Sequence, residues 1–410
     1  MPLLEEEGFA GQSKELLGKQ LSALLEMTQA INSKLSDQSL LKIYYYTLLA
    51  HLKLMKLALY VPEGTGWVCK FHSGVPYNYN EIPLPESLQH IVDFVRVAEL
   101  PVPEEFKVFN LAIPIIHDDT TLACLLVDNE QLSPAGAIDK SFLQTMTYLV
   151  MVAIENRRLT RRQIEQEAMR KELEIAKEVQ EMLFPKSLPN NDKYAIYASY
   201  LPHHSISGDY YDYVKIDENR FLICVADVSG KGVPASLLMS NFQACLRTLL
   251  RQSIGLEELV KTLNYQIYVN AKAEKFITAF FAVYDSRTRE LSYVNAGHNA
   301  SILISEDNTV QMLEEGSTMI GIMDELPFIN VKTLKVEPRS FLLCYTDGLT
   351  EVFNSEEEEF GEENTIEILK QCRYYGSAQI HQRLLNEINQ YKKENTLFDD
   401  DITLLSCRFK

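Results

Sequence analysis

Four short acidic motifs occur in the C-terminal half of this 410-residue chain. They read Ser-Gly-Asp-Tyr-Tyr-Asp over 207–212, Ala-Asp-Val-Ser-Gly-Lys-Gly-Val-Pro-Ala over 226–235, Tyr-Thr-Asp-Gly-Leu-Thr-Glu over 345–351 and Asp-Asp-Asp-Ile-Thr over 399–403. Each motif lies at the edge of an apolar run that is typical of a β-strand. Carboxylates held at strand ends supply the oxygen ligands that Mg²⁺ and Mn²⁺ prefer. The four motifs together therefore predict a divalent-metal site.

The region that contains these motifs resembles a known family. Residues from about Ala176 to Lys410 resemble the metal-dependent Ser/Thr protein phosphatases (PPM, or type 2C), and most closely the bacterial branch of sporulation protein E and the stress-response sigma-regulator phosphatases. Besides the motifs, the resemblance rests on the run 176–185, on Asn295-Ala-Gly-His-Asn299 and on Phe360-Gly361. It implies an αββα sandwich that hydrolyses phosphoserine or phosphothreonine on a regulatory protein of the anti-sigma-antagonist type.

The same resemblance implies the cofactor and its ligands. Two Mn²⁺ or Mg²⁺ ions per catalytic domain would activate a bridging water for in-line attack. Asp227 would bridge both ions and is the main catalytic candidate. The implied metal ligands come from all four motifs: Asp209, Asp227, the backbone carbonyl of Val228, Asp347 and Asp400, with Asp401 as the alternative to Asp400.

Several other residues in these motifs have two interpretations. His298 is either a general acid for the leaving alkoxide or a hydrogen-bonded structural histidine. Asp212 either touches the metal network or caps a turn. Lys231 either attracts phosphate or is a solvated lysine in a glycine-rich turn into a helix near Pro234. Gly348 is expected to form a tight turn.

The elements that must position these residues are mostly strands. Unbroken apolar runs predict buried strands over 221–226 and 341–345. Further strands are predicted over 276–284, 290–304 and 403–409, and helices over 233–251, 256–273, 362–372 and 377–393. Runs of strands with helices in pairs indicate two packed antiparallel sheets flanked by helices, over residues 186–410.

The N-terminal part is predicted as a separate domain, so the fold class is α+β. Residues 1–13 are expected to be a loose start, and 14–155 follow the order of a GAF-like α/β sensor domain, with a PAS-like domain as the nearest competitor. Apolar runs over 111–116 and 122–127 predict a hairpin. The charged run 156–185 predicts a helical coiled-coil connector that continues the last sensor helix.

Two helical stripes bear on assembly. The first has heptad spacing and predicts either a helix docked on its own domain or a parallel dimer seam. Its members are Leu17, Leu21, Leu24, Thr28, Ile31 and Leu35. The second stripe contains Phe142, Met146, Leu149 and Ala153. Together with the connector, these stripes predict a homodimer formed through long helices.

Composition excludes several classes of function. A formal charge of −18 argues against nucleic-acid binding, which needs a basic face. The longest apolar run, over 148–154, is too short to span a bilayer, so no membrane partner is expected. Seven scattered cysteines without a Cys-x-x-Cys pair indicate reduced thiols in a cytosol.

Two alternative functions remain at this point. A catalytically weak phosphatase fold could act as a scaffold in a partner-switching pathway, although every acidic position is filled. A nucleotide cyclase is disfavoured, because strand-end acids such as Asp347 and Asp400 have no place in that fold. The sequence specifies neither the signal that the sensor detects nor whether that signal activates or inhibits the enzyme.

Overall fold

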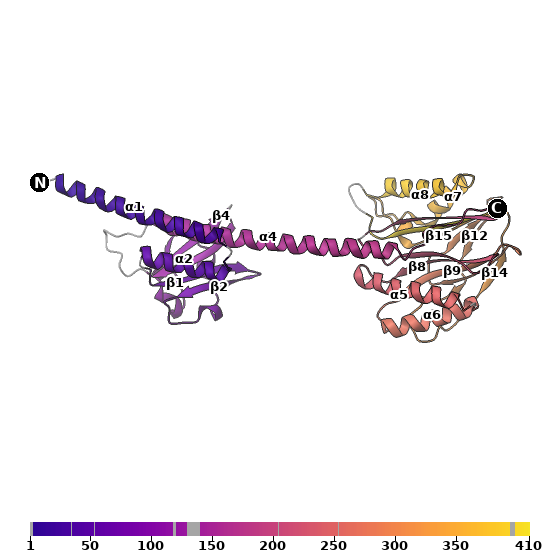
Figure 1. Ribbon diagram of the computed structural model, residues 1–410, viewed down its shortest axis with the longest axis horizontal. Helices are drawn as coiled ribbons and strands as arrows, with labels where there is room; N and C mark the ends of the chain where they lie inside the picture. The colour runs from indigo at the N-terminus through magenta and orange to yellow at the C-terminus, as the bar shows by residue number, and fades with distance from the viewer. Residues whose placement is uncertain are drawn as a thin grey trace. The chain divides into compact units, whose positions relative to one another are not determined.

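The computed structural model describes residues 3–33, 35–52, 54–117, 120–128, 140–203, 205–252, 254–393 and 398–410. The chain divides into two compact units, Met1–Glu167 and Ala168–Lys410 (Figure 1). Helix α4 (Lys140–Glu181) runs without a break through the boundary and includes most of the segment that was predicted as a connector. Among helices in the described ranges, none is long and apolar enough to cross a membrane.

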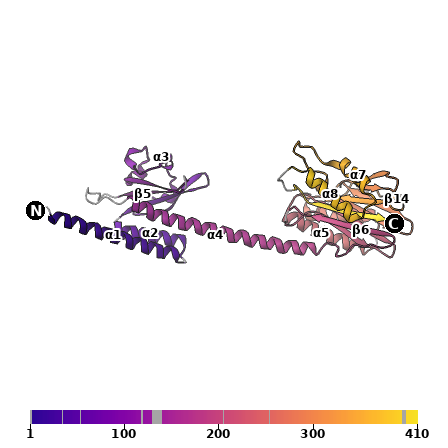
Figure 2. The ribbon, with the colours of Figure 1, turned by 90° about the horizontal axis from the view of Figure 1, so that it is seen from above.

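The first unit is a five-stranded antiparallel sheet with the strand order β2-β1-β5-β4-β3. Its elements are α1 (Leu3–Asn32), α2 (Asp37–Leu52), β1 (Lys56–Glu63), β2 (Gly66–Ser73), η1 (Tyr79–Glu81), α3 (Glu86–Gln89), β3 (Val95–Arg96), η2 (Val97–Glu99), η3 (Glu104–Val108), β4 (Leu111–His117), β5 (Thr120–Asp128) and the first part of α4. The predicted hairpin is confirmed, since β4 and β5 pair antiparallel. Figure 2 shows α1, α2 and α4 on one face of this sheet and α3 on the other.

The inner strands of this sheet, β1, β5 and β4, carry apolar residues on both faces, and both of these faces are buried. Along β1, Leu57 and Leu59 pack against the long helices. Ala58 and Tyr60 lie on the opposite face, against the short helices and loops that cover it. Strands that are buried on both faces have nearly continuous apolar sequences, and these apolar runs predicted the strands.

Two expectations for the first unit were wrong. Residues 1–13 were expected to be loose, but α1 begins at Leu3, because the segment contains no proline after its start and several good helix formers. The stripe of Phe142 and Met146 was assigned to a dimer, but both side chains are buried in the unit's own core. Heptad spacing describes any helix face that packs on a flat surface, so it does not identify the partner.

The second unit is a two-layer β-sandwich covered by helix pairs. Its strands are β6 (Tyr194–Leu201), β7 (Tyr210–Lys215), β8 (Arg220–Val228), β9 (Ile277–Asp285), β10 (Glu290–Ala296), β11 (Ser301–Ile304), β12 (Val310–Leu313), β13 (Gly316–Ser317), β14 (Lys332–Lys335), β15 (Phe341–Tyr345) and β16 (Ile402–Phe409). Its helices are α5 (Val233–Leu250), α6 (Leu256–Ala271), η4 (Asp347–Leu349), α7 (Gly361–Cys372) and α8 (Ser377–Tyr391), besides the end of α4.

The order of the layers confirms the predicted αββα arrangement. One sheet has the order β13-β10-β9-β8-β7, with β14 on β10, and the other has the order β12-β11-β15-β16-β6. Helices α5 and α6 cover the first sheet and α7 and α8 cover the second (Figure 1). Between the sheets, residues such as Val225, Phe280 and Leu405 form a third apolar layer. This inter-sheet layer ends at the acidic motifs.

Candidate metal centre

The acidic motifs meet where strands of the two sheets end side by side. Side chains on a strand alternate between its two faces, so residue parity decides which carboxylates face the other sheet. On β8, Ile223 and Val225 lie in the inter-sheet layer, which puts Asp227 on the same face. Tyr211 and Tyr213 pack against that layer too, so Asp209, directly before β7, has inward parity.

Asp209 is fixed by two threonines of the opposite sheet. Its side chain is 2% exposed. Its Oδ2 accepts hydrogen bonds from Thr346 Oγ1 at 2.8 Å and from Thr403 Oγ1 at 2.5 Å. The backbone N–H of Thr403 donates to Thr346 Oγ1 at 2.9 Å, which holds the two hydroxyls together. The carboxylate of the first motif is therefore oriented by threonines of the third and fourth motifs.

Gly208 lets the first and second motifs approach closely. A Cβ on Gly208 would lie 2.9 Å from the carbonyl oxygen of Val228 and 3.5 Å from Asp227 Oδ1. The backbone beside Asp209 therefore leaves open space next to the two oxygen groups that the resemblance assigned to metal. Gly230 and Gly232 have φ of +87° and +76° and turn the chain from Asp227 into α5, as predicted.

The third and fourth motifs approach each other in the same way. A Cβ on Gly348 would lie 2.1 Å from the carbonyl oxygen of Asp401. The expected tight turn is present, since Gly348 is the middle residue of η4, where the N–H of Thr350 donates to the carbonyl of Asp347 at 2.8 Å. Its φ is not positive, so a glycine is needed there for the close approach of η4, which carries Asp347, to Asp401 directly before β16. Asp401 Oδ1 accepts a hydrogen bond from the backbone N–H of His203 at 2.6 Å.

Lys231 provides a cation at this site. Its Nζ lies 2.9 Å from Asp400 Oδ2 and donates to the carbonyl of Asp399 at 2.6 Å. Burial alone lowers the pKa of Lys231, but the hydrogen bond and charge of Asp400 and its acidic neighbours raise it above the usual value. The structure thus favours neither original interpretation of Lys231, because its ammonium group contacts a carboxylate of the predicted metal site.

Crowding of carboxylates raises their pKa values. Burial, followed by the charges of Asp347 and Asp400, raises the pKa of Asp227 to about 7. Burial, Glu351 and Asp400 raise the pKa of Asp347 to about 6. The pKa of Asp209 is also well above its usual value, because of burial and Asp227, although Thr403 opposes the shift. The electrostatic interactions place these acids in one network, in which the carboxylates outnumber the nearby cation Lys231.

This donor set fits a hard divalent cation. The site offers carboxylates and a backbone carbonyl, which are the ligand types of Mg²⁺ and Mn²⁺. Within the described residues, no three carboxylate, thiol or imidazole groups already converge as a cage for an ion. Asp400 pairs with Lys231 instead. A bound cation would relieve the repulsion that raises the pKa values of Asp227 and Asp347.

Asp212 does not belong to this centre. Its even parity on β7 turns it away from Asp209 and toward α5, where it is fully buried. Arg247 of α5 donates from Nε to Asp212 Oδ2 and from Nη2 to Oδ1, both at 2.8 Å. Tyr210 OH donates to Oδ2 at 2.5 Å, and the Tyr213 N–H donates to Oδ1 at 2.8 Å. Asp212 therefore ties a strand to a helix and neither caps a turn nor touches the metal network.

His298 is a buried residue of a turn. Its side chain is 8% exposed, and its Nδ1 shares a 2.9 Å hydrogen bond with Thr278 Oγ1. The backbone N–H of His298 donates to Asn295 Oδ1 at 2.7 Å. The ring atom Nε2 has no hydrogen-bond partner among the described residues. Burial lowers the pKa of His298 to about 4, so the imidazole is neutral near pH 7. This favours the structural interpretation, since a general acid must carry a proton that it can give.

The end of α4 contacts the loop that carries Asp209. Gln180 is 5% exposed. Its Nε2 donates to the carbonyl of Ser207 at 2.8 Å, and the N–H of Ser207 donates back to Gln180 Oε1 at 3.1 Å. The Ser207 hydroxyl accepts from the Asp209 N–H at 3.0 Å. The connector is thus two hydrogen bonds from a predicted metal ligand.

Sequence reasoning missed several residues of this centre. Thr346, Thr403 and Glu351 lie inside the quoted motifs, and strand parity could have identified the two threonines. Gln180 and Arg247 lie on helices far from their partners in sequence, so no local pattern marks them.

The fold and this set of carboxylates define a phosphatase of the metal-dependent PP2C type. Comparison with solved structures supports the fold, since the SiaA-PP2C domain of Pseudomonas aeruginosa superposes with a TM-score of 0.53 at 21% identity. That similarity covers 60% of this chain and 99% of the SiaA domain.

Sequence comparisons identify the family. The model for stage II sporulation protein E (SpoIIE) matches residues 217–410. Phosphoserine phosphatase RsbU of Bacillus subtilis is 32% identical over 257 residues, which are 61% of this chain and 73% of RsbU. Protein IcfG of Synechocystis is 27% identical over 264 residues, which are 58% of this chain but only 41% of IcfG. The chain belongs to the SpoIIE-type family of metal-dependent Ser/Thr phosphatases.

Proposed function

We propose that this protein is a signal-regulated protein Ser/Thr phosphatase that acts on a phosphoserine or phosphothreonine of a regulatory protein, of the anti-sigma-antagonist type. The single observation that carries the proposal is the network of carboxylates at the end of the inter-sheet layer, in which burial and like charge raise the pKa of Asp227 to about 7. Bound cations would reduce the repulsion between these carboxylates. Cations also stabilise the negative charge of a phosphoryl group during its transfer.

The proposed centre holds two Mn²⁺ or Mg²⁺ ions. Asp227 would contact both, with Asp209 and the Val228 carbonyl on one side. Asp347 and Asp400 would complete the other side. Bound ions would activate a water and neutralise the phosphoryl oxygens. The chain's own groups have separate tasks, since Thr346 and Thr403 hold Asp209 in one orientation and Gly208 leaves room beside it.

Phosphate release from a phosphorylated anti-sigma-antagonist protein tests this function. The wild-type chain should release phosphate with Mn²⁺ and not with a chelator. Asp227→Asn should bind the phosphoprotein without turnover. Wild-type binding without metal-dependent turnover would instead support the scaffold, and the proposed enzyme function would be wrong.

We further propose that the first unit is a GAF-like sensor whose signal reaches the centre through α4. Gln180 supports this route, because it pairs with the backbone of Ser207 two residues before Asp209. A second contact leads to α5, where Gln243 Nε2 donates to the carbonyl of Leu183 at 3.3 Å. The connector therefore contacts both the loop before Asp209 and the helix after Asp227, and metal affinity is the regulated quantity.

Insertions into α4 test this route. Two residues inserted near Met169 rotate the rest of the helix by about 200°, whereas seven residues rotate it by only about 20° from its original phase. The two-residue insertion should change the Mn²⁺ affinity measured by calorimetry, and the seven-residue insertion should change it much less. Equal affinities in all three chains would make the connector a passive tether.

We also propose a homodimer, and the proposal rests on exposed apolar side chains of the long helices rather than on heptad spacing. Leu17 and Leu21 are 66% and 60% exposed, and Met169 and Val179 on α4 are exposed as well. Leu24 packs partly against its own core, so Leu24→Asp would disturb the first unit itself. Leu21→Asp is the better variant, and light scattering should show that it shifts a wild-type dimer toward monomer. A wild-type monomer at micromolar concentration would refute the dimer.

The proposal extends to a reducing compartment such as the cytosol. All seven cysteines are free thiols, and six of them are buried. Burial raises the pKa of Cys124 and Cys344 to about 12, which keeps both protonated and unreactive.

A further inference from the structure

A basic pocket lies at the opposite end of the strands that lead to the acidic centre. Phe341 at the start of β15 pairs with Arg408 near the end of β16. Thr346, which contacts Asp209, follows five residues after Phe341, or about 16 Å away at 3.3 Å per residue. The pocket has a volume of about 440 Å³, which suits a small organic ligand. It is therefore a separate cavity in the same unit.

The charge of this pocket is opposite to that of the protein. Four cationic side chains line it, and Glu306 is the one acidic residue among its ten described lining residues. These cations are Arg339, Arg373, Arg408 and Lys410. The whole chain has 57 acidic and 39 basic residues, so a local excess of cations is not expected from composition. The neighbouring Asp307 is engaged by Thr309, which donates to it from N–H and Oγ1.

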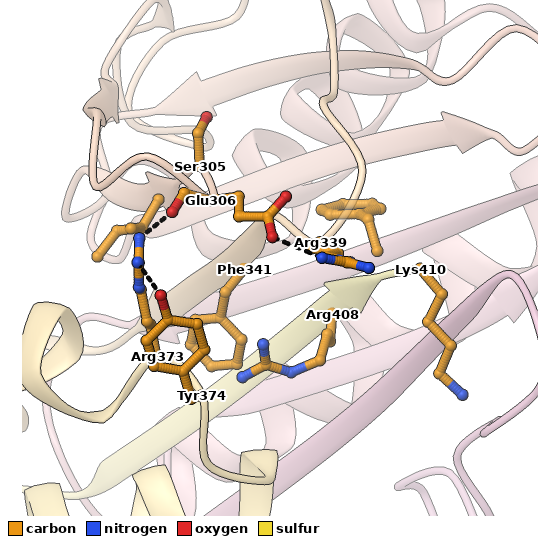
Figure 3. Close-up of a pocket in the computed structure, with 10 residues that line it drawn as sticks. Ser305, Glu306, Arg339, Phe341, Arg373, Tyr374, Arg408 and Lys410 are labelled. Carbon is orange, nitrogen blue, oxygen red and sulfur yellow. Dashed lines mark hydrogen bonds and ion pairs between the residues drawn. The ribbon is translucent and has the colours of Figure 1, made fainter.

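Glu306 does not neutralise all four cations. Its carboxylate accepts from Arg339 Nη1 at 2.7 Å, while its backbone carbonyl accepts from Arg373 (Figure 3). Arg408 donates to the carbonyl of Tyr375 at 2.9 Å and pairs with no carboxylate among the described residues. Partial burial lowers the pKa of Arg408. An anionic ligand would supply the missing charge.

The pocket also offers flat apolar surfaces. The guanidinium of Arg408 lies 4.9 Å from the centroid of the Phe341 ring, and that of Arg373 lies 4.3 Å from the Tyr374 ring. Tyr374 is 77% exposed, so its ring can stack on a ligand. Figure 3 shows Arg373 and Tyr374 on one side, Arg339 on the other, Phe341 and Arg408 between them, and Glu306 joined to both Arg373 and Arg339. Arginines arranged in this way suit phosphate oxygens, which they bind through paired N–H groups.

We propose that this pocket binds a phosphate monoester that carries a planar ring, the chemistry of a mononucleotide. Arg408 and Arg339 contact the phosphate, and the exposed face of Tyr374 stacks on the ring. The acidic centre cannot take this role without metal, because its carboxylates repel an anion. Strands β15 and β16 connect the two sites directly.

Calorimetric titration of the full chain tests the pocket, with AMP, inorganic phosphate and adenosine as probes. Every titration uses the Asp227→Asn background without divalent ions, so that the acidic centre remains closed to anions. AMP should bind about tenfold or more tightly than either inorganic phosphate or adenosine, because only AMP uses both surfaces. No saturable AMP binding at millimolar concentration, or AMP binding no tighter than phosphate, would overturn the proposal.

Matched arginine variants locate the binding. Arg408→Met should weaken AMP binding by about tenfold or more, the effect of losing one charge-assisted contact. Arg339→Met provides a second variant that leaves the core intact, since Arg339 is 74% exposed. Arg287→Met is the control, because Arg287 is exposed and pairs with Asp285 in another turn. Equal AMP affinity in the Arg339 and Arg287 variants would refute the assignment.

Discussion

Buried carboxylates have opposite surroundings on the two faces of the sheet formed by β7, β8, β9 and β10. On the face toward the other sheet, Asp209 and Asp227 have mainly carboxylates as charged neighbours, and their pKa values rise. On the face toward α5, Asp212 meets Arg247 in a two-point ion pair. Compensated charge stabilises a fold, whereas uncompensated charge indicates a ligand site. The variants below separate these two cases.

The largest expected effect is on catalysis by the uncompensated face. Asp227→Asn should reduce turnover of a phosphoprotein by more than the ~10²–10³-fold typical of losing one preorganised electrostatic contact. The melting temperature of the metal-free chain at pH 8 should not fall, because the variant removes a repelled charge. A lower melting temperature together with near wild-type turnover would show that Asp227 is structural and that the comparison is wrong.

Asp212→Asn should have the reverse signature. Leaving Arg247 without its partner should cost about 2–3 kcal/mol of stability, less than the ~3–5 of a fully buried pair because Arg247 is 41% exposed. Turnover per folded molecule should stay close to wild type. Asp285→Asn is a matched control, since Asp285 pairs with Arg287 at the surface and should change stability by at most about 1 kcal/mol. Chemical denaturation and rates measured on the same samples decide the point.

Asp209 and Asp212 also show how far sequence reasoning can go. Both lie in one six-residue motif, and the resemblance implied a metal role for Asp209 but left the role of Asp212 open. Their odd spacing on one strand puts them on opposite faces, so parity would have assigned Asp212 to the helix side. The identity of its partner, Arg247, still required the structure, because 35 residues separate the two and the register of α5 on the sheet decides the contact.

The four motifs come together in the structure because each of them contains its own strand end. The packing of long helices was less predictable. Phe142 and Met146 have the same spacing whether they face a sheet or a second helix, and only the presence of β4 and β5 against α4 distinguishes these cases. Gln180 escaped notice for a related reason, since an amide that pairs with backbone leaves no pattern in composition or charge.

His381 is a buried group that is neutral near pH 7, and its burial predicts a pH dependence of the stability of the second unit. Burial lowers its pKa to about 3, while its ring nitrogens share hydrogen bonds with Ser199 and Ser406, each at 2.9 Å. A depressed folded-state pKa means that the unfolded chain binds the proton more tightly. Its contribution to stability is thus complete above pH 6.5, the unfolded value, and is lost as pH falls toward 3, by about 2 kcal/mol between pH 6.5 and pH 5.

His381→Asn should therefore flatten the pH dependence of unfolding of the second unit in this window. Calorimetry can follow that transition, while the single tryptophan, Trp67, reports the first unit by fluorescence. The slope is the quantity to compare, since the variant also lowers stability at every pH by losing hydrogen bonds. An unchanged slope in His381→Asn would contradict the buried neutral state.

The smallest expected effect concerns Lys231, a positive charge beside the carboxylates of the face toward the other sheet. Its ammonium group pairs with Asp400, but both side chains are nearly half exposed, at 46% and 43%. Such pairs contribute about 0–1 kcal/mol, so displacing the ammonium should cost a metal ion at most about fivefold in affinity. Lys231→Gln should accordingly tighten Mn²⁺ binding by up to that factor in calorimetric titrations. Lys215→Gln, at an exposed lysine that pairs with Glu218, is the control. Weaker Mn²⁺ binding in Lys231→Gln would mean that the lysine organises the carboxylates for the ion rather than competing with it.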